Sequence, residues 1–232
     1  MCGRYTITES PRQLAIRFQA ELDERLADLP PRYNVAPTQI VPIVRFDDGR
    51  RVTPMRWGLV PAWADDPAIG NRLINARGET LASKASFRTA FRKRRCLVPA
   101  DGFYEWPKSP RGKTPMRIAL ADGGVFAFAG LWERWTGPAG DELLTFTIVT
   151  TDANEKLKPI HDRMPVILEP ASEERWLDPQ IDPAKLKDLI RPAPPDRLVA
   201  YAVSKRVNSP KNDEPSLIRP ANDGDADTLP IN

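Results

Sequence analysis

The sequence predicts an α+β protein with a single mixed, mainly antiparallel, β-rich domain and flanking helices. Three observations support this fold class. Proline supplies 25 of the 232 residues, about twice its usual share of roughly 5%, which favours short strands and fixed turns over long helices. The chain is 41% hydrophobic, which is enough to bury a core. Strand-like runs outnumber helical ones, and no regular helical crossovers separate them, which disfavours a doubly wound parallel sheet.

The first predicted helix spans residues 10–29. Ser10 suits the N-cap position, and Pro11 suits the first helical position. Apolar residues recur at every fourth position and would face the core, namely Leu14, Phe18, Leu22 and Leu26. Further helices are predicted at 79–95, 172–177 and 183–190.

Strands are predicted from runs of apolar, β-branched and aromatic residues that turn residues separate. They cover residues 40–46, 52–57, 95–100, 115–120, 125–132, 143–150, 164–168 and 198–203. The sequence contains no internal repeat and no clear linker, so residues 1–220 are predicted to form one domain. Residues 221–232 are polar, with three Asp and no basic side chain, and we expect a flexible C-terminal tail there.

Composition limits the chemistry of the chain. A structural zinc site usually takes four Cys or His ligands, and the sequence has two Cys and one His, so we predict no metal and no cofactor. There is no run of about 18 apolar residues and no signal-peptide h-region, so we expect a cytoplasmic protein with no membrane partner. In that compartment Cys2 and Cys96 are expected to stay free thiols.

The formal net charge of +3 is too small to identify a nucleic-acid-binding protein. Basic residues are nevertheless concentrated in residues 84–117, which contain ten Lys or Arg and two acidic side chains. One interpretation is a solvated helix face followed by a polar hairpin. The other is a groove for phosphates, with aromatic side chains that stack on bases. The aromatic candidates nearby are Trp63, Phe103, Tyr104 and Trp106.

Cys2 is the most informative single residue. Methionine is commonly removed when a small residue follows it, so we expect Met1 to leave and Cys2 to become the N-terminus. Its amine and thiol would then lie on adjacent carbons, with ordinary pKa values of about 7.7–8.0 and about 8.5. Such an aminothiol attacks an aldehyde in two steps, first forming an imine and then closing a thiazolidine ring through sulfur. The alternative is a buried cysteine without a chemical role.

Three other segments offer groups for this chemistry. Asn75, Arg77 and Glu79 alternate along LINARGET, which would put them on one side of an extended segment. Glu105 lies between aromatic residues in FYEW, where burial would raise its pKa towards acid–base function. His161 is the only histidine, and its near-neutral pKa suits proton transfer. Simpler alternatives stay open: a glutamate at a rim, a structural histidine and an asparagine that caps a turn.

Nine blocks of sequence together resemble the SOS-response-associated peptidase (SRAP) family. They span nearly the whole chain in the family's order, beginning with a cysteine at position 2. The blocks are MCGRY (1–5), RYNVAPT (32–38), WGLVPAW (57–63), INARGET (74–80), FRKRRCLVPADGFYEW (91–106), GLWERW (130–135), TIVTTDAN (147–154), IHDRMPVIL (160–168) and VSKRVNS (203–209). The resemblance implies a barrel-like, SRAP-type fold and a sensor of abasic sites, in which the N-terminal cysteine forms a thiazolidine with the ring-opened sugar and shields the lesion.

The resemblance also implies roles for individual residues. Cys2 would be the nucleophile, and Asn75 would hold the reacting amine and sugar. Glu105 would transfer protons during ring opening and dehydration, and His161 would assist imine formation and reversal. Arg4, Arg77 and Arg163 would contact DNA phosphates, and Pro37, Trp63, Trp106 and Thr150 would line the DNA groove. Some relatives carry a second aromatic residue after the position of Trp63, whereas this chain has Ala64.

The implied partner is single-stranded DNA with an abasic site, including junctions with duplex, bound by a monomer that associates with the nucleoid. Two other functions stay open. A cysteine-type peptidase would also use Cys2, with self-processing of Met1 as its simplest form. A non-covalent single-strand or RNA-binding module would use the basic stretch and the tryptophans. Cys96 is predicted to be core, because RCLVPA is typical of a buried strand.

Overall fold

The computed structural model describes residues 2–107 and 114–221. Its centre is a closed five-strand barrel in the order β5, β4, β7, β10, β11 and back to β5. The strands are β4 (Ile40–Phe46), β5 (Arg50–Trp57), β7 (Arg95–Ala100), β10 (Phe126–Thr136) and β11 (Glu142–Asp152). Neighbouring strands are antiparallel, except that β5 and β11 close the ring in parallel. The predicted α+β, mainly antiparallel and barrel-like fold is confirmed.

Short strands extend the barrel sheet at its edges. β6 (Asn75–Arg77) pairs in parallel with β11, and β12 (Arg163–Pro165) pairs with β11 in the antiparallel direction. β13 (Ile167–Leu168) pairs with β10, and β2 (Glu21–Leu22) pairs with β5. Thr150 of β11 has partners in both β6 and β12. These two short strands therefore flank the end of β11 and carry their side chains to the same place.

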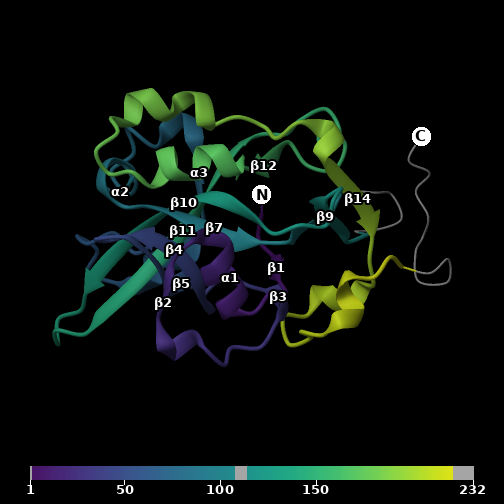
Figure 1. The fold of residues 1–232 in the computed structure, drawn as a ribbon, viewed down its shortest axis with the longest axis horizontal. Helices are drawn as coiled ribbons and strands as arrows, with labels where there is room; N and C mark the ends of the chain where they lie inside the picture. Colours follow the sequence, from purple (N-terminus) through teal and green to yellow (C-terminus); the bar gives the residue numbers. More distant parts are fainter. Residues whose placement is uncertain (1, 108–113, 222–232) are drawn as a thin grey trace.

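A second sheet of five strands contains the start of the chain. Its order is β14, β9, β8, β1, β3, and all neighbours are antiparallel. The strands are β1 (Tyr5–Ile7), β3 (Arg32–Val35), β8 (Gly102–Glu105), β9 (Met116–Leu120) and β14 (Leu198–Ala202). Figure 1 shows the N-terminus near the middle of the view, beside β1. Because β1 has a partner on each side, the first described residues lead directly into an interior strand.

Aromatic side chains join the two sheets. Tyr5 of β1 packs edge-on against Trp57 of β5 and Phe128 of β10, with ring centroids 5.2 and 6.1 Å apart. All three side chains are fully buried, and such edge-to-face pairs add to the stabilisation that burial supplies. One continuous cluster of buried hydrophobic residues contains members of both sheets. The barrel and the second sheet therefore share a core.

The first helix is shorter than predicted. α1 covers Pro11–Phe18, and the side chain of Ser10 caps it as the sequence indicates. Gln19 then adopts a left-handed conformation with φ of 50°, which ends the helix. The rest of the predicted segment 10–29 forms β2 and a 3-10 turn at Glu24–Leu26. The pairing of β2 with β5 replaces the helical hydrogen bonds that the apolar spacing suggested.

The helix predicted at 79–95 is also wrong in extent. Its only α-helical part is α2 (Arg88–Lys93), and a 3-10 turn at Gly78–Thr80 precedes it. No side chain caps α2 at its N-terminus, and Arg95 already belongs to β7. Six residues of β7 pair with β10, so sheet formation ends the helix early.

The other predicted elements are present with small shifts. α3 (Pro170–Leu177) matches the helix predicted at 172–177, and the segment predicted at 183–190 is helical but of the 3-10 type, Pro183–Leu189. Every predicted strand is found, although 164–168 is divided between β12 and β13. The prediction missed β1, β2, β3, β6 and β8. Strands of two to four residues are too short for a periodic pattern, and they form because partners far along the chain pair with them.

The chain is still paired at residue 221, where the flexible tail was predicted to begin. The Ala221 N–H donates to the carbonyl oxygen of Ala202 in β14 at 2.8 Å. The rest of that predicted tail, 222–232, lies outside the described residues. None of the helices in residues 2–107 and 114–221 has both the length and the hydropathy required to cross a membrane.

Candidate active site

Cys2 is held inside the protein, immediately before β1. It is fully buried, and Asn75 Nδ2 donates a hydrogen bond to its backbone carbonyl oxygen at 2.7 Å. The Cys2 thiol contacts the carbonyl oxygen of Arg4 at 3.8 Å. Cys2 and Asn75 are 73 residues apart in the sequence, so it is the pairing of β6 with the barrel that brings these two groups together.

Strand register puts several of the predicted residues on one face of the sheet. Asn75 lies opposite Ile148, and Arg77 lies opposite Thr150. On the other edge of β11, Arg163 of β12 lies opposite the strand's last residue. Residues that are directly opposite, or two apart along a strand, point to the same face. That face is therefore shared by Asn75 and Arg77 of β6, Thr150 of β11 and Arg163 of β12.

Glu105 ends β8 and lies within electrostatic reach of Cys2. The Glu105 side chain is buried, and burial raises the pKa of its carboxyl above the ordinary value, while the charge of His161 opposes that increase. Burial also raises the pKa of the Cys2 thiol, and the negative charge of Glu105 raises it further. The thiol, rather than the thiolate, is therefore the resting form of Cys2 at neutral pH.

The backbone of Arg163 orients the imidazole of His161. Its Nδ1 accepts a hydrogen bond from the backbone N–H of Arg163 at 2.9 Å. When Nδ1 accepts this bond, the neutral ring carries its proton on Nε2; Nδ1 also lies 3.2 Å from the Arg163 carbonyl oxygen, to which it donates when it is protonated. His161 is half-buried. With the proton on Nε2, the ring presents a donor there.

Two carboxylates hold the guanidinium of Arg163. It donates to both carboxylate oxygens of Glu79 at 2.6 and 2.8 Å, and to Asp152 at 2.6 Å. It also donates to the carbonyl oxygen of Thr150 at 2.9 Å. Glu79 is not in the extended segment where the sequence predicted it, because the chain turns into a 3-10 helix after β6. That turn carries its carboxylate to Arg163 and ties the segment after β6 to β12.

Arg4 and Trp106 contact each other at the start of the second sheet. The Arg4 guanidinium lies 5.8 Å from the centre of the Trp106 ring, within the range of a cation–π interaction. Arg4 Nη1 donates to Asn34 Oδ1 at 2.7 Å and to the carbonyl oxygen of Val207 at 2.9 Å. Trp106 Nε1 donates to Asn208 Oδ1 at 2.7 Å. Both side chains are half-buried, so the fold sets their orientation before any ligand binds.

Comparisons with known proteins identify the family. The family model described as SOS response associated peptidase (SRAP) matches residues 1–210. This chain belongs to the SRAP family. The abasic site processing protein YoqW of Bacillus subtilis (strain 168) is 47% identical over 221 residues, which are 94% of this chain and 99% of that protein. The abasic site processing protein YedK of Escherichia coli (strain K12) is 33% identical over 231 residues, 95% of this chain and 100% of that protein.

Solved structures of similar chains agree with the SRAP fold. A protein from Bacteroides thetaiotaomicron superposes with a TM-score of 0.88 at 30% identity, over 95% of this chain and 100% of that one. A protein from Bordetella bronchiseptica superposes with a TM-score of 0.75 at 28% identity, over 88% of this chain and 100% of that one. The family resemblance predicted from the nine sequence blocks is confirmed.

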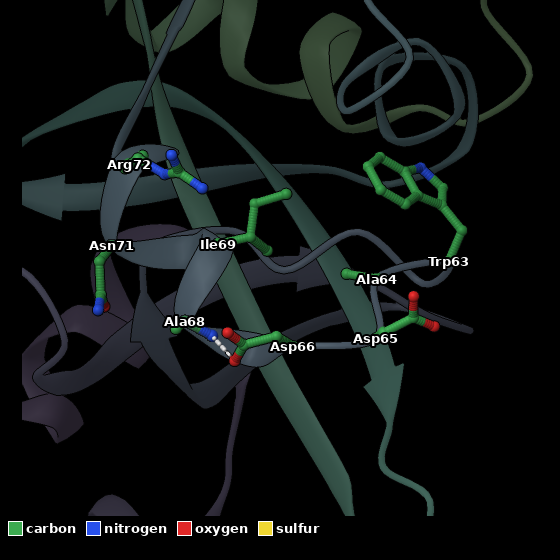
Figure 2. Close-up of a pocket in the computed structure, with 8 residues that line it drawn as sticks. All are labelled: Trp63, Ala64, Asp65, Asp66, Ala68, Ile69, Asn71 and Arg72. Carbon is green, nitrogen blue, oxygen red and sulfur yellow. Dashed lines mark hydrogen bonds between the residues drawn. The ribbon is translucent and has the colours of Figure 1, made fainter.

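In this SRAP chain Trp63 lies at the surface. The Trp63 side chain is 60% exposed and lines a cavity of about 540 Å³ with the turn that follows it. Figure 2 shows its indole standing away from the rest of that lining. Ala64 is buried, and its carbonyl oxygen accepts from Trp135 Nε1 at 2.7 Å. Pro37 is half-buried in the loop after β3, and within the described residues no hydrogen bond or ring contact joins it or Trp63 to Cys2.

Two of the four aromatic side chains predicted to stack on bases cannot do so. Phe103 and Tyr104 are fully buried, because both faces of β8 are covered. Phe103 packs against Phe128 with ring centroids 5.8 Å apart, and the Tyr104 hydroxyl donates to the carbonyl oxygen of Tyr33 at 2.8 Å. Thr150, which was predicted to line the DNA groove, is also fully buried.

In its described part, the basic run at 84–117 does not form a single groove. Two of its arginines are buried: Arg95 donates to the carbonyl oxygen of Trp176 at 2.6 Å, and Arg117 pairs with Asp101 at 3.0 Å. The run is therefore partly structural. Its members Lys108, Arg111 and Lys113 lie outside the described residues. Its exposed members in the described part are Lys84, Arg88, Arg92 and Lys93.

Cys96 is a fully buried core residue, as predicted, and both cysteines are free thiols. No role was predicted for Asn34, Asp152 or Asn208, which hold Arg4, Arg163 and Trp106. Their only signal was membership in the quoted blocks, because the hydrogen-bond partners of Asn34 and Asn208 are 30 and 102 residues away. Among the described residues, no three His, Cys, Asp or Glu side chains gather as a metal ligand set.

Proposed function

We propose that this SRAP protein recognises abasic sites in single-stranded DNA and captures them covalently through Cys2, after Met1 has been removed. The observation that carries the proposal is the group of side chains around Cys2: an amide on its carbonyl, a buried carboxyl and an oriented imidazole. Relatives that are 47% and 33% identical are named abasic site processing proteins. An amine and a thiol on adjacent carbons can trap the aldehyde that a missing base exposes.

The proposed reaction requires no reactant other than Cys2 and the lesion. The α-amino nitrogen of Cys2 adds to C1′ of the ring-opened sugar and gives a carbinolamine. The carbinolamine hydroxyl takes one proton and leaves as water, which gives an iminium ion. The Cys2 sulfur then adds to the same carbon, and the thiol loses its proton. The product is a five-membered thiazolidine, and one water molecule is released overall.

Glu105 can supply the proton that this sequence requires and take it back. Its raised pKa keeps more of the carboxyl protonated near neutral pH than in an ordinary glutamate. The acid form protonates the departing hydroxyl. The resulting carboxylate then accepts the proton of the Cys2 thiol, whose own pKa is raised. Glu105 therefore ends the reaction in the protonation state in which it began.

Asn75 and His161 are proposed to position the reactants. The hydrogen bond from Asn75 holds the carbonyl of Cys2, and so it limits the directions that the amine and the thiol of that residue can take. The Nε2 proton of His161 is suited to a hydrogen bond with the sugar oxygen that polarises the aldehyde. The same donor assists the reverse reaction, when the ring opens and water returns.

The proposed contacts with DNA differ in how easily a strand reaches them. Arg77 and Trp63 are exposed, so phosphate and base contacts can form there without rearrangement. Arg163 already binds two carboxylates, and Thr150 is buried, so contacts at these residues require neighbouring groups to move. The half-buried members of the set are Arg4, Pro37 and Trp106.

The decisive experiment uses an oligonucleotide that carries one abasic site. We expect an adduct that survives denaturing electrophoresis, formed by protein whose intact mass lacks Met1. The same oligonucleotide with an intact base should give none. Cys2→Ser keeps the amine but lacks the sulfur, so it should form only an imine that borohydride traps. Full conjugation by protein that still carries Met1 would contradict the proposal.

The family description names a peptidase, which supports a second proposal. In it, Cys2 removes Met1 from its own chain, with Glu105 as the proton-transfer group. Intact mass of Glu105→Gln should then show retained Met1, and complete removal would assign the cleavage to another enzyme. Cleavage of added peptides by the mature protein would instead favour general proteolysis. Binding of abasic DNA without any adduct would favour a non-covalent module.

We also propose that the protein acts as a monomer on nucleoid DNA in the cytoplasm. Light scattering of the DNA complex tests the number of protein copies that are bound.

A further inference from the structure

A groove lies between α2 and the segment 179–187, and we call it the α2 groove. Its volume is about 630 Å³, within the range of about 300–1,000 Å³ that is usual for ligand sites. Figure 1 shows α2 at the upper left, whereas the N-terminus is nearer the middle. The proposed function uses none of the residues that line this groove. It is therefore a second candidate site, independent of the chemistry at Cys2.

Cations are concentrated on the α2 side of the groove. Arg88, Arg92 and Lys93 come from α2, and Lys187 comes from the 3-10 segment Pro183–Leu189. All four side chains are exposed, and in residues 2–107 and 114–221 none of them forms an ion pair or a side-chain hydrogen bond. The acidic residue in the lining is Asp182, whose carboxylate accepts from a backbone N–H of the 3-10 segment at 2.9 Å. The groove therefore keeps a net positive charge that favours an anionic ligand.

The wall that faces α2 is mainly apolar. Its apolar members are Pro179, Ile181, Pro183 and Ala184, and α2 adds Phe91 to the lining. Pro179 and Ala184 are exposed, and Ile181 and Pro183 are half-buried. Covering such a surface with apolar groups is favourable, and a nucleic-acid backbone supplies phosphates and sugars without apolar side chains. The lining therefore favours a peptide that carries both carboxylates and apolar side chains.

The spacing of the α2 cations matches an extended peptide. Arg88 and Arg92 are four residues apart on one helix, so they project from the same face about 6 Å apart along the helix axis. In an extended peptide, side chains at alternate positions point to the same side and lie about 6.6 Å apart. Two acidic residues at alternate positions can therefore meet the two arginines. The side chains between them then point the other way, towards the apolar wall.

We propose that the α2 groove binds an extended segment of a partner protein in which acidic and apolar residues alternate. The carboxylates pair with Arg88 and Arg92, and the apolar side chains cover the wall formed by residues 179–184. Residues 222–232 of the chain itself contain three Asp. However, Ala221 is bonded to β14, and Figure 1 shows β14 on the side of the view opposite to α2. The segment is therefore assigned to another protein.

The test measures the fluorescence anisotropy of labelled peptides with the full-length protein in the absence of DNA. The probe is the peptide Gly-Asp-Leu-Asp-Ile-Asp-Leu-Asp-Gly, and a second peptide has serine in place of each Leu and Ile. A peptide of residues 222–232 represents the end of the chain itself. A short undamaged DNA duplex represents nucleic acid.

Two variants change the groove in different ways. Arg88→Gln/Arg92→Gln removes the two spaced cations. Ala184→Glu keeps every cation and adds a carboxylate to the facing wall at an exposed position, so it removes no native contact. Arg12→Gln/Arg134→Gln is the control for the first variant, with the same loss of net charge at exposed positions in α1 and β10. Urea denaturation checks that all of the proteins are folded.

We expect the alternating probe to reach saturation below about 1 mM and to bind more weakly as KCl is added. Each groove variant should weaken its binding roughly 3- to 30-fold, and the control should stay within about twofold of wild type. The serine peptide should bind at least about tenfold more weakly than the probe, because it has no apolar side chain to bury.

No saturation by the alternating probe, or equal losses in the groove variants and the control, would overturn the proposal. Equal binding of the serine peptide would overturn it too, because charge alone would then explain the affinity. Binding of residues 222–232 that is as tight as that of the probe would assign the groove to the chain itself. A loss confined to the duplex would assign it to nucleic acid. None of these measurements involves Cys2 or an abasic site, so the proposed function can fail or stand independently.

Discussion

The two cysteines of the protein lie in contrasting surroundings, although both are fully buried free thiols. Cys96 is the second residue of β7, opposite Arg45 of β4 and Gly130 of β10. A Cβ atom on Gly130 would lie 2.8 Å from the Cys96 sulfur. Cys2 lies at the junction of both sheets, where Asn75 binds its carbonyl and Glu105 influences its thiol.

Burial raises the pKa of both thiols, so neither burial nor the direction of the shift separates a reactive cysteine from a structural one. The polar groups around each thiol are what distinguish the two cysteines. Burial alone raises the pKa of the Cys96 thiol, and in the described part of the chain no neighbouring charge contributes to that increase. Around Cys2 a carboxyl, an imidazole and an amide have been brought in from two strands and a loop. The difference predicts that one cysteine supports chemistry and the other supports packing.

Alanine at each cysteine in turn gives the largest expected effect. Cys2→Ala should lose the denaturant-resistant adduct completely, because no thiol remains beside the amine to close the ring. Cys96→Ala should keep the adduct and lose about 1 kcal/mol of stability, as expected for a small buried deletion. Electrophoresis with abasic DNA measures the first quantity and urea denaturation the second. An adduct that depends on Cys96 would end the distinction between the two sites.

Glu105→Gln should slow adduct formation by about 10²- to 10⁴-fold, the usual contribution of a general acid–base. Affinity for undamaged single strands should stay near the wild-type value. Because this variant could retain Met1, both proteins are made with a cleavable leader whose removal leaves Cys2 first. Glu133→Gln is the matched control, since Glu133 is equally buried and pairs with Arg94 instead. A rate loss no larger than that of Glu133→Gln would remove Glu105 from the mechanism.

Gly130→Ala should destabilise the protein by about 1–3 kcal/mol through overpacking. The new Cβ would lie 2.8 Å from both the Cys96 sulfur and Val98 Cγ2, inside a barrel that cannot expand locally. Adding Cys96→Ala should recover part of that loss, so the double-mutant cycle measures a coupling between the two positions. Purely additive stabilities would show that the sulfur does not limit space at Gly130. Adduct formation should be unaffected in all three proteins.

The smallest expected effect is the pH dependence of stability. The folded protein binds the Glu105 proton more tightly than the unfolded chain does, because burial raises that pKa. Wild type therefore loses stability as the pH rises through the folded pKa, and this loss is absent below the unfolded value of about 4.3. Glu105→Gln should gain stability relative to wild type at about pH 8 and lose that advantage near about pH 4. A variant that is less stable at about pH 8 would mean that the carboxylate form is the one the site favours.

Much of the candidate site could be identified from the sequence, but its contacts could not. Cys2, Asn75, Glu105 and His161 could be selected from the nine blocks because the chemistry of their side chains suits the proposed reaction. The partners of Arg163 and Arg4 were not predictable in this way. Arg163 is proposed to meet a phosphate, and in the structure its guanidinium is held by Glu79 and Asp152. Charge alone does not tell which of many carboxylates or phosphates an arginine meets.

Secondary structure was predictable where it depends on residues that are neighbours in the sequence. The capping of α1 by Ser10 and the long strands of the barrel followed from neighbours in the sequence. The ends of the helices were wrong where a strand pairing, at β2 or at β7, competed with helical hydrogen bonds. The five short strands were missed for the same reason, since each exists only through its partner.

The amino-acid sequence by itself determined the β-rich class, the family, the core position of Cys96 and the cysteine at position 2, whose proposed role is to capture a carbonyl. These follow from composition, local spacing and residue chemistry, which act over a few positions of the chain. Only the tertiary structure decided the parallel closure of the barrel between β5 and β11, the contact of Asn75 with Cys2, and the division of the basic run into buried arginines and exposed cations. Those features depend on groups tens of residues apart, and their positions are set by which strands pair and which surfaces the shared core buries.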